Sequence, residues 1–295
     1  MRLNVANAAA VSVLWGTPAP EGRPVAASEI EHVFRHNGVP IAALDSDVVS
    51  RVQERAGLAD YIKRDQTILR RLEERYAAIV ERWSQDGVRS VLLKSPGYFP
   101  YTSSNLDVLV DPAMVDVAAR SLRSFGYIES HSLREPYKRY FKDPASDVER
   151  DDVHLHTAVA WITRFITAEA IMQNARQSRE RPNFDIPSVE HLVMITLAHF
   201  LYEDKTISLR DLLNMSLATH DSPDWQAIAA ETHRGGWRKG FDIAVSSIKR
   251  VGRALGIGDL ESLPETDADP RFVTRIESAA AFPIESASCQ QDMEG

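Results

Sequence analysis

The sequence predicts an α+β fold: a small mixed sheet with helices, followed by a helical subdomain. Two observations indicate this arrangement. Between residues 88 and 156, short apolar runs that are typical of buried strands surround one amphipathic helix. From residue 160 onward, the apolar residues recur at the three- and four-residue spacing of helices. A chain of 295 residues with 44% hydrophobic and 26% charged positions has the composition of a globular protein with room for more than one domain.

Four segments are expected along the chain: an N-terminal segment, an α+β domain, a helical subdomain and a tail. In order, their bounds are residues 1–58, 59–160, 161–256 and 257–295. The first segment contains a predicted short strand at residues 8–15 and two predicted helices. The last is acidic and rich in Pro, Ser and Ala, which predicts a disordered tail. The pattern leaves open whether the first segment is a separate unit or packs onto the core.

A long helix is predicted at residues 59–85, because apolar side chains recur on one face and Asp86-Gly87 stops it. Further on, Asp111-Pro112 predicts a helix N-cap with proline at the first helical position, and that helix ends at Gly126. Strands are expected at residues 88–94, 106–110, 127–131, 137–142 and 153–156. The helices of the last part are expected at residues 188–202, 208–219, 223–233 and 237–255.

Asp107 is the most informative single residue, because it interrupts a run of Leu and Val. An ionised carboxylate in such a strand costs several kcal/mol unless a cation or hydrogen bonds compensate it. The preceding strand ends in Lys94, and the loop between the two strands contains Ser95 and Gly97. An inward acid beside a turn of small residues predicts a site for a metal ion and phosphate. A salt bridge from Asp107 to a nearby Lys or Arg is the alternative.

Several short motifs occur in a fixed order. Val-Leu-Leu-Lys is followed by a loop, by Asn-Leu-Asp-Val-Leu-Val, by a helix that ends in Ser-Phe-Gly-Tyr, and by a strand Val-His-Leu-His. Leu197-Ala198-His199 and the run Leu-Arg-Asp-Leu-Leu follow in the helical half. Over about residues 60–230, this ordered set resembles the nucleotidyltransferase superfamily with the DNA-polymerase-β-like fold, and within it the bacterial family of uncharacterised nucleotidyltransferases.

The resemblance implies metal-dependent transfer of a nucleoside monophosphate from a nucleoside triphosphate to an unidentified acceptor, whether a small molecule, a peptide or a protein. Mg²⁺ or Mn²⁺ would neutralise charge in that transfer, and acids two apart on a strand can share one ion. The implied residues are Asp107, Asp152 and His156 for catalysis, Asn105, Asp107 and His154 for the metal, and Lys94, Ser95, Gly97 and Ser104 for the phosphates.

The chain departs from the family pattern at the metal-binding positions. Asn105 stands where the family has the first acid of a pair, and His154 stands where it has the acid of a later strand. Two negative charges are therefore lost, and a nitrogen ligand from His154 suits Zn²⁺ better than Mg²⁺. Asp152 alternates with His154 and His156 along one predicted strand, so all three face one side, and Asp152 can restore a carboxylate.

Other interpretations of the same residues stay open. The main alternative is a catalytically degenerate member that binds a nucleotide, a peptide or a protein, for example as an accessory protein of a biosynthetic gene cluster. His154 and His156 are equally expected on a solvated face, and His199 is more often a core histidine. A basic cluster either meets substrate phosphates or lies on a charged edge strand. Its members are Arg134, Lys138, Arg139 and Lys142.

Charge and composition narrow the partners. The formal net charge of −8 argues against a broad nucleic-acid-binding surface, so we expect no nucleic-acid partner. Cys289 is the only cysteine, which excludes an intrachain disulfide and a cysteine-based zinc cluster. No stretch approaches the roughly 20 apolar residues of a membrane-spanning helix, and the thin basic start of the chain argues against a signal peptide. We therefore expect a cytoplasmic protein without a membrane partner.

Overall fold

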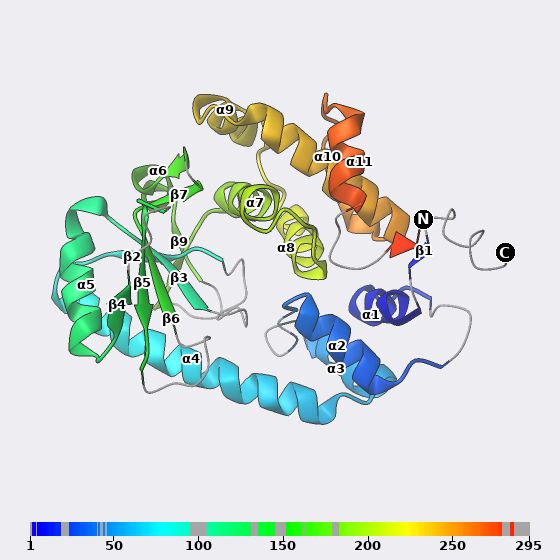
Figure 1. Cartoon of the computed structure of the whole chain (residues 1–295), viewed down its shortest axis with the longest axis horizontal. Helices are drawn as coiled ribbons and strands as arrows, with labels where there is room; N and C mark the ends of the chain where they lie inside the picture. The colour runs from blue at the N-terminus through cyan, green and yellow to red at the C-terminus, as the bar shows by residue number, and fades with distance from the viewer. Residues whose placement is uncertain are drawn as a thin grey trace.

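A five-stranded mixed sheet forms the β part of the fold, and helices lie on both of its faces (Figure 1). Its strands follow the order β2-β3-β6-β5-β4, in which β3 and β6 are parallel and the other neighbours are antiparallel. The short antiparallel pairs β1-β11, β7-β8 and β9-β10 lie outside this sheet. The predicted α+β class, with a small mixed sheet and a helical part, is confirmed.

The computed structural model describes residues 2–3, 5–18, 24–39, 41, 44, 46–94, 105–130, 135–144, 152–161, 163–178, 183–278 and 284–285. The strands are β1 Arg2–Leu3, β2 Ser90–Leu92, β3 Asn105–Val110, β4 Ile128–Ser130, β5 Lys138–Lys142, β6 Asp152–His156, β7 Ala158–Trp161, β8 Thr163–Thr167, β9 Arg176–Gln177, β10 Asp185–Ile186 and β11 Ile284–Glu285. The α-helices are α1 Val5–Trp15, α2 Ala27–His36, α3 Ser46–Ala56, α4 Ala59–Gln85, α5 Val115–Ser124, α6 Ala168–Gln173, α7 Val189–Ala198, α8 Leu209–His220, α9 Trp225–Arg234, α10 Arg238–Leu255 and α11 Pro270–Ser278. Short helices of other kinds are η2 Pro112–Met114, η4 His199–Asp204 and η5 Gly258–Ser262. Among these described residues, no helix combines the length and the apolar composition needed to span a lipid bilayer.

The long helix α4 and helix α5 cover one face of the sheet. Leu106, Val108 and Val110 point to this face and are buried against Trp83 of α4 and Leu122 of α5. The two-residue spacing on β3 and the three- and four-residue spacing on the helices place these side chains on facing surfaces. Each such side chain contributes about 1.5–3 kcal/mol when it is fully buried.

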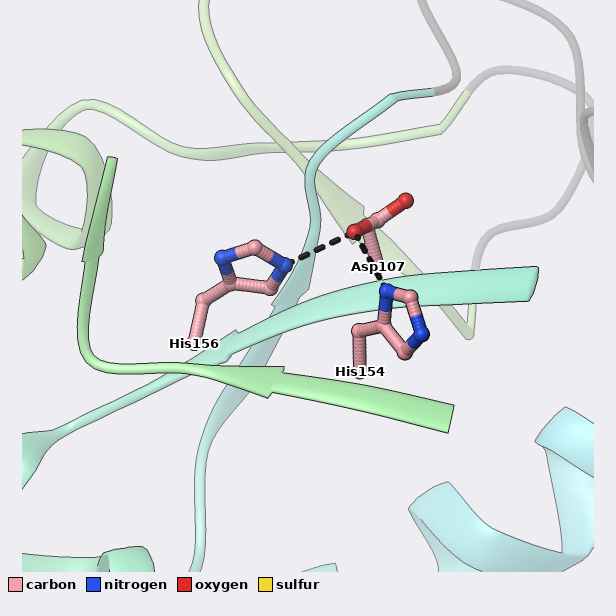
Figure 2. Close-up of side chains that lie close together, drawn as sticks. All are labelled: Asp107, His154 and His156. Carbon is pink, nitrogen blue, oxygen red and sulfur yellow. Dashed lines mark hydrogen bonds and ion pairs between the residues drawn. The ribbon is translucent and has the colours of Figure 1, made fainter. Parts of the chain in front are cut away.

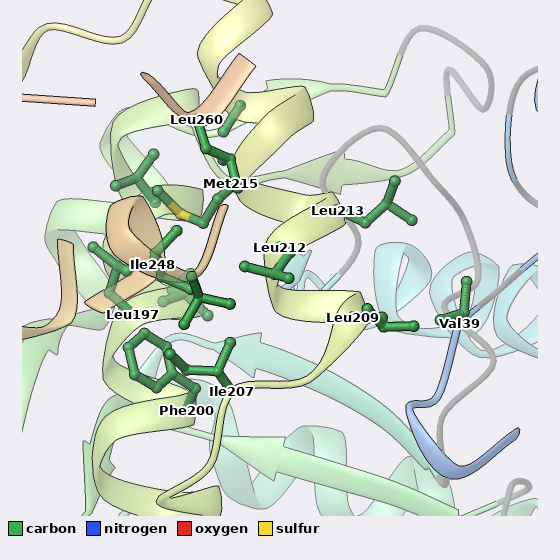
Figure 3. Close-up of a cluster of buried hydrophobic side chains, with 14 of the residues drawn as sticks. Val39, Leu197, Phe200, Ile207, Leu209, Leu212, Leu213, Met215, Ile248 and Leu260 are labelled. Carbon is green, nitrogen blue, oxygen red and sulfur yellow. The ribbon is translucent and has the colours of Figure 1, made fainter. Parts of the chain in front are cut away.

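The second face of the sheet is directed at the helical half. Val91, Leu93 and Leu109 belong to a larger core that includes side chains of α7, α8 and α10. Figure 3 shows part of this core. The side chains labelled there are Val39, Leu197, Phe200, Ile207, Leu209, Leu212, Leu213, Met215, Ile248 and Leu260.

The N-terminal helices are part of the same core. Ala10 of α1 and Phe34 of α2 are fully buried in it. Arg51 of α3 donates to the carbonyl oxygens of Val13 and Leu14, at 3.2 and 2.9 Å, and so satisfies groups at the end of α1. The described part of residues 1–58 therefore packs onto the rest of the chain, which answers the question that the sequence pattern left open.

The predicted strand at residues 8–15 is wrong, because these residues belong to helix α1. A short apolar run has no clear periodicity that distinguishes a strand from a buried helix. Alanine, the strongest helix former, recurs in this segment, and buried residues lie on several sides of the helix. Because residues on several sides of α1 are buried, its apolar residues show no 3.6-residue period in the sequence.

Two other predictions need correction. Strands β8, β9 and β10 lie beyond residue 160, where the pattern predicts only helices. Residues from 257 onward are not a disordered tail throughout, because η5 and α11 are helices and bury Leu260 and Val273 to 0% and 2% exposure. Composition averaged over the whole segment conceals these short apolar contacts. Residues 286–295 lie outside the described part of the chain.

The predicted cap at Asp111 is confirmed, and the structure adds a cap at the start of α8. Asp111 accepts a hydrogen bond from Ala113 N at 2.8 Å, and Pro112 begins the turn before α5. Ser208 caps α8, and Asp211 accepts a hydrogen bond from Ser208 N at 2.9 Å, which completes a capping box. These caps fix the residues at which the turn before α5 and helix α8 begin.

Asn37 connects the N-terminal segment to α8 and provides a test of this arrangement. Asn37 is 2% exposed, and its Oδ1 accepts from Leu209 N at 3.0 Å. Asn37→Ala removes the acceptor of a buried N–H, so we expect the free energy of unfolding to fall by about 1–3 kcal/mol. Urea denaturation measures this change. The exposed Gln53→Ala on α3 is the control, and an equal loss in both variants would contradict the assigned contact.

Candidate active site

Polar side chains gather on the second face of the sheet, along two adjacent parallel strands. Asn105 and Asp107 alternate on β3, and Asp152, His154 and His156 alternate on β6. The register places Asn105 beside Asp152 and Asp107 beside His154. Because neighbours in register point to the same face, the structure brings these five predicted residues onto one surface.

Asp107 is the centre of this cluster, and Figure 2 shows both histidine rings directed at its carboxylate. Only 1% of its side chain is exposed. His156 Nε2 donates to Oδ1 at 2.7 Å, and His154 Nδ1 lies 3.5 Å from the same oxygen. Lys94 Nζ, just after β2, lies 3.2 Å from Oδ2. Three groups from two chain segments, the end of β2 and strand β6, therefore compensate the buried carboxylate.

The electrostatics identify Lys94 as the compensating cation. Burial alone raises the pKa of Asp107, but the Lys94 ammonium, followed by the contacts from His154 and His156, holds that pKa well below its ordinary value of 3.8. Burial lowers the pKa of His156 below 6.5, and Asp107 offsets this only in part. At neutral pH, the cluster therefore contains an ionised Asp107 beside a neutral His156.

Asn105 holds His154 in place. The amide of Asn105 contacts both ring nitrogens of His154, with Nδ2 2.9 Å from Nε2. Tyr140 packs edge-on against the same ring, with centroids 4.6 Å apart. Asp152 shares this face of the sheet, but within the described part of the chain the donor atoms that lie within 4.8 Å of one another come from Asp107, His154 and His156 alone. Asn105 therefore positions a histidine, and Asp152 is outside the tight donor group.

The three donors fit a divalent ion of borderline hardness. Two imidazole nitrogens and a carboxylate oxygen lie within 4.8 Å of one another. Oδ2 of Asp107 is buried and accepts no hydrogen bond of normal geometry from the described residues. Two histidines and one carboxylate are a known ligand set of catalytic zinc sites, whereas Mg²⁺ prefers an all-oxygen shell. The donor set therefore suits Zn²⁺, or Mn²⁺ as an intermediate case, better than Mg²⁺.

The helical half adds Glu203 and His199, which the motifs did not assign to the site. Both lie on the π-helical turn η4 after α7, and His199 Nε2 lies 3.3 Å from Glu203 Oε2. Glu203 Oε2 lies 3.8 Å from Lys94 Nζ, and its Oε1 lies 3.5 Å from Lys138 Nζ. The only sequence signal for Glu203 is its position four residues after His199. The π-helical turn does not follow the 3.6-residue period of an α-helix, so that period does not predict where the Glu203 side chain points.

These contacts determine the charge states of the two residues. Burial alone raises the pKa of Glu203, but Lys94, His199 and Lys138 lower it to about 2. Burial, followed by the Lys94 charge, holds the pKa of His199 well below 6.5. Glu203 is therefore ionised and His199 neutral at pH 7. His199, expected as a core histidine, is largely buried and is partnered by Glu203 beside the pocket.

A pocket opens beside the cluster, between the sheet and the helical half. Its lining is mostly apolar, with polar groups from Lys94, His156, His199 and Glu203. The apolar lining residues are Leu93, Val159, Ala160, Phe165, Ile195 and Ala198. A second pocket shares Lys94 and His199 with the first and extends toward Arg210. Lys94 and His199 therefore lie where the two pockets meet.

Some predicted residues lie elsewhere. Ser95, Gly97 and Ser104, the predicted phosphate contacts of the loop, fall outside the described residues, as does Arg134. Arg139 points to the opposite face of the sheet, where its guanidinium lies 2.7 Å from Asp116. Lys138 is the described member of the predicted basic cluster that contacts Glu203.

The chain is similar to known nucleotidyltransferases. A model of the family described as "Uncharacterised nucleotidyltransferase" matches residues 70–251, more than half of the chain, which confirms the resemblance seen in the motifs. Among solved structures, the solution structure of the antibiotic-resistance factor ANT(2'')-Ia is similar, with 10% identity, a TM-score of 0.41, and coverage of 62% of this chain and 97% of that one. A search of curated proteins finds no match.

The ion pairs of Glu203 predict a pH-dependent contribution to stability. Its pKa falls from 4.5 to about 2 on folding, so the unfolded chain binds more protons between these values. The wild type is therefore stabilised relative to Glu203→Gln above about pH 4.5, and this advantage declines as pH falls from 4.5 toward 2. Urea denaturation between pH 7 and about pH 3.5 measures the difference. Glu81→Gln, exposed on α4, is the control, and a wild-type advantage that does not change with pH would refute the assignment.

Proposed function

Because the chain belongs to the uncharacterised nucleotidyltransferase family, we propose that it transfers a nucleoside monophosphate from a nucleoside triphosphate to an acceptor in a metal-dependent reaction. Family membership supports nucleotidyl transfer as the general reaction. One observation supports a metal-dependent reaction: Asp107 is buried, and the donor atoms of Asp107, His154 and His156 lie within 4.8 Å of one another. A buried charged carboxylate is costly, and such groups concentrate at functional sites.

In this proposal, Asp107, His154 and His156 hold one divalent ion, and Asn105 orients His154. When bound, the ion would neutralise negative charge on the phosphoryl group that is transferred. Lys94, 3.2 Å from Asp107, supplies a second positive charge for the phosphates. The donor chemistry favours Zn²⁺ or Mn²⁺ over Mg²⁺.

The transfer forms one bond and breaks another. An acceptor hydroxyl loses its proton, its oxygen bonds to the α-phosphorus, and the bond from that phosphorus to the bridging oxygen breaks, so that diphosphate leaves. By position, His156 is the candidate base for this proton. In the site proposed above it is a metal ligand instead, and the proton that its Nε2 donates to Asp107 at 2.7 Å would leave when the ion binds, so that the acceptor's proton would go to solvent. The mostly apolar pocket beside His156 is the proposed entry for the acceptor.

Thermal unfolding with ligands tests the proposal. We expect the protein to be stabilised by one nucleoside triphosphate together with Mn²⁺ or Zn²⁺, by about 2.7 kcal/mol when the ligand is present at 100 times its dissociation constant. Asp107→Asn keeps the shape of the side chain but removes its charge, so it should abolish the metal-dependent part of this shift. Each nucleoside triphosphate is measured alone and with Mg²⁺, Mn²⁺ or Zn²⁺.

Asp116→Asn is the matched control, because Asp116 lies on α5 at the opposite face of the sheet and is 79% exposed. It should respond to nucleotide and metal as the wild type does. Equal metal responses of wild type and Asp107→Asn would show that Asp107 is not a ligand, and the proposed metal site would fail.

A specific observation favours a second candidate, a catalytically degenerate protein that binds its ligand without turnover. The Lys94 ammonium already lies 3.2 Å from Oδ2 of Asp107, so the chain's own cation compensates the acid. In addition, Asn105 and His154 replace two acids of the family pattern. The cleft would then serve to bind a nucleotide, a peptide or a protein.

Restoring the family acids distinguishes the two candidates. The double variant Asn105→Asp/His154→Asp replaces neutral groups with two carboxylates, which favour Mg²⁺. If the wild type releases diphosphate from a nucleoside triphosphate, we expect the double variant to shift its metal preference toward Mg²⁺. If only the double variant releases diphosphate, the degenerate candidate holds and the proposed catalysis fails.

A further inference from the structure

Two lysines of the site are unusually well buried. The side chain of Lys138 is 8% exposed and that of Lys94 is 16% exposed. Lysine side chains are almost never fully buried unless they are paired. Lys94 follows β2 and Lys138 begins β5, so the two cations approach the cleft from strands that are not neighbours in the sheet.

One carboxylate from the helical half lies between these two lysines. Oε2 of Glu203 lies 3.8 Å from Lys94 Nζ, and Oε1 lies 3.5 Å from Lys138 Nζ. The distances are longer than those of a tight charge-assisted hydrogen bond, which are about 2.7–2.9 Å. The contact is therefore electrostatic rather than a close-fitting permanent bond. Glu203 is also 33% exposed, so its carboxylate has access to solvent.

Three acidic groups surround the two lysines and fully compensate their charge. Lys94 also contacts Asp107 at 3.2 Å, and Lys138 also contacts Glu135 at 3.4 Å. An added polyphosphate would bring further negative charge close to Glu203, and like charges at short range are unfavourable. A phosphate group offers two or more oxygens to two cations, as the carboxylate of Glu203 does. The two anions therefore compete for the same lysines.

We propose that Lys94 and Lys138 form a binding subsite for the anionic phosphate tail of a nucleoside triphosphate, and that Glu203 occupies this subsite until the tail displaces it. The inference rests on the proposed function and deepens it by adding Lys138 and Glu203 to the site. Displacement moves only the side chain of Glu203 toward solvent and needs no new cation.

Calorimetric titration of the full chain with inorganic tripolyphosphate tests this subsite directly. The buffer contains a chelator and no divalent ion, so that binding reports the protein's own cations. Glu203→Gln removes the competing charge and should bind tripolyphosphate about tenfold more tightly than the wild type. Lys138→Gln should bind about tenfold more weakly, and Lys138→Arg, which keeps the charge, should stay near the wild-type affinity.

Glu261→Gln is the matched control. It makes the same change in net charge, but Glu261 pairs with Arg253 at 2.8 Å on η5, outside the cleft. Its affinity should equal that of the wild type. A gain of affinity in Glu203→Gln cannot arise from misfolding, whereas the loss in Lys138→Gln is interpreted only if its urea midpoint shows a folded protein.

The proposal is overturned if Glu203→Gln binds tripolyphosphate no more tightly than the wild type, or if neither protein binds it. It is also overturned if Glu261→Gln gains as much affinity as Glu203→Gln, because the effect would then be one of net charge. Tripolyphosphate has no nucleoside and needs no acceptor. Binding that responds to Glu203 without any nucleotide turnover would therefore uphold the subsite while the proposed transfer fails, and turnover without a Glu203 effect would do the reverse.

Discussion

Asp107 carries a negative charge in a strand whose neighbouring side chains are aliphatic, and 1% of its side chain is exposed. Removing a carboxylate from water costs several kcal/mol unless nearby groups compensate it. Lys94, just after β2, and His156 of β6 do so from the two sides of β3. A slip of β6 by one residue would turn His154 and His156 to the opposite face. The register at the centre of the sheet is therefore constrained by one charge as well as by apolar packing.

The same charge connects the sheet to the helical half. Lys94 lies between Asp107 and Glu203, at 3.2 and 3.8 Å, so a residue after β2 links an acid of the sheet to an acid of η4. The first pocket is lined by residues from the sheet and from the helical half. Lys94 and His199 line both this pocket and the second one. A charged ligand that contacts Lys94 would therefore also act on its ion pair with Glu203 of η4.

The predictable parts of the fold are those with a clear period or a local capping signal. Helix α4 matches the predicted residues 59–85, since its apolar residues repeat on one face and Gly87 follows its end. The Asp111 cap depends only on residues a few positions away, and it was predicted correctly. Helix α1 was missed because it is buried on several sides and shows no helical period. Helix α11 was missed because average composition obscures a few buried side chains such as Val273.

The sequence by itself determined that Asn105 and Asp107 share one face, and that Asp152, His154 and His156 share one face, because side chains two residues apart on a strand point the same way. It also determined that Asp107 needs compensation. Only the tertiary structure decided which groups provide it. The parallel pairing of β3 with β6 brings the histidines to Asp107, and the path of the chain through α7 brings Glu203 to Lys94. These contacts join residues far apart in the chain, and no local propensity or period specifies which distant segments pack together.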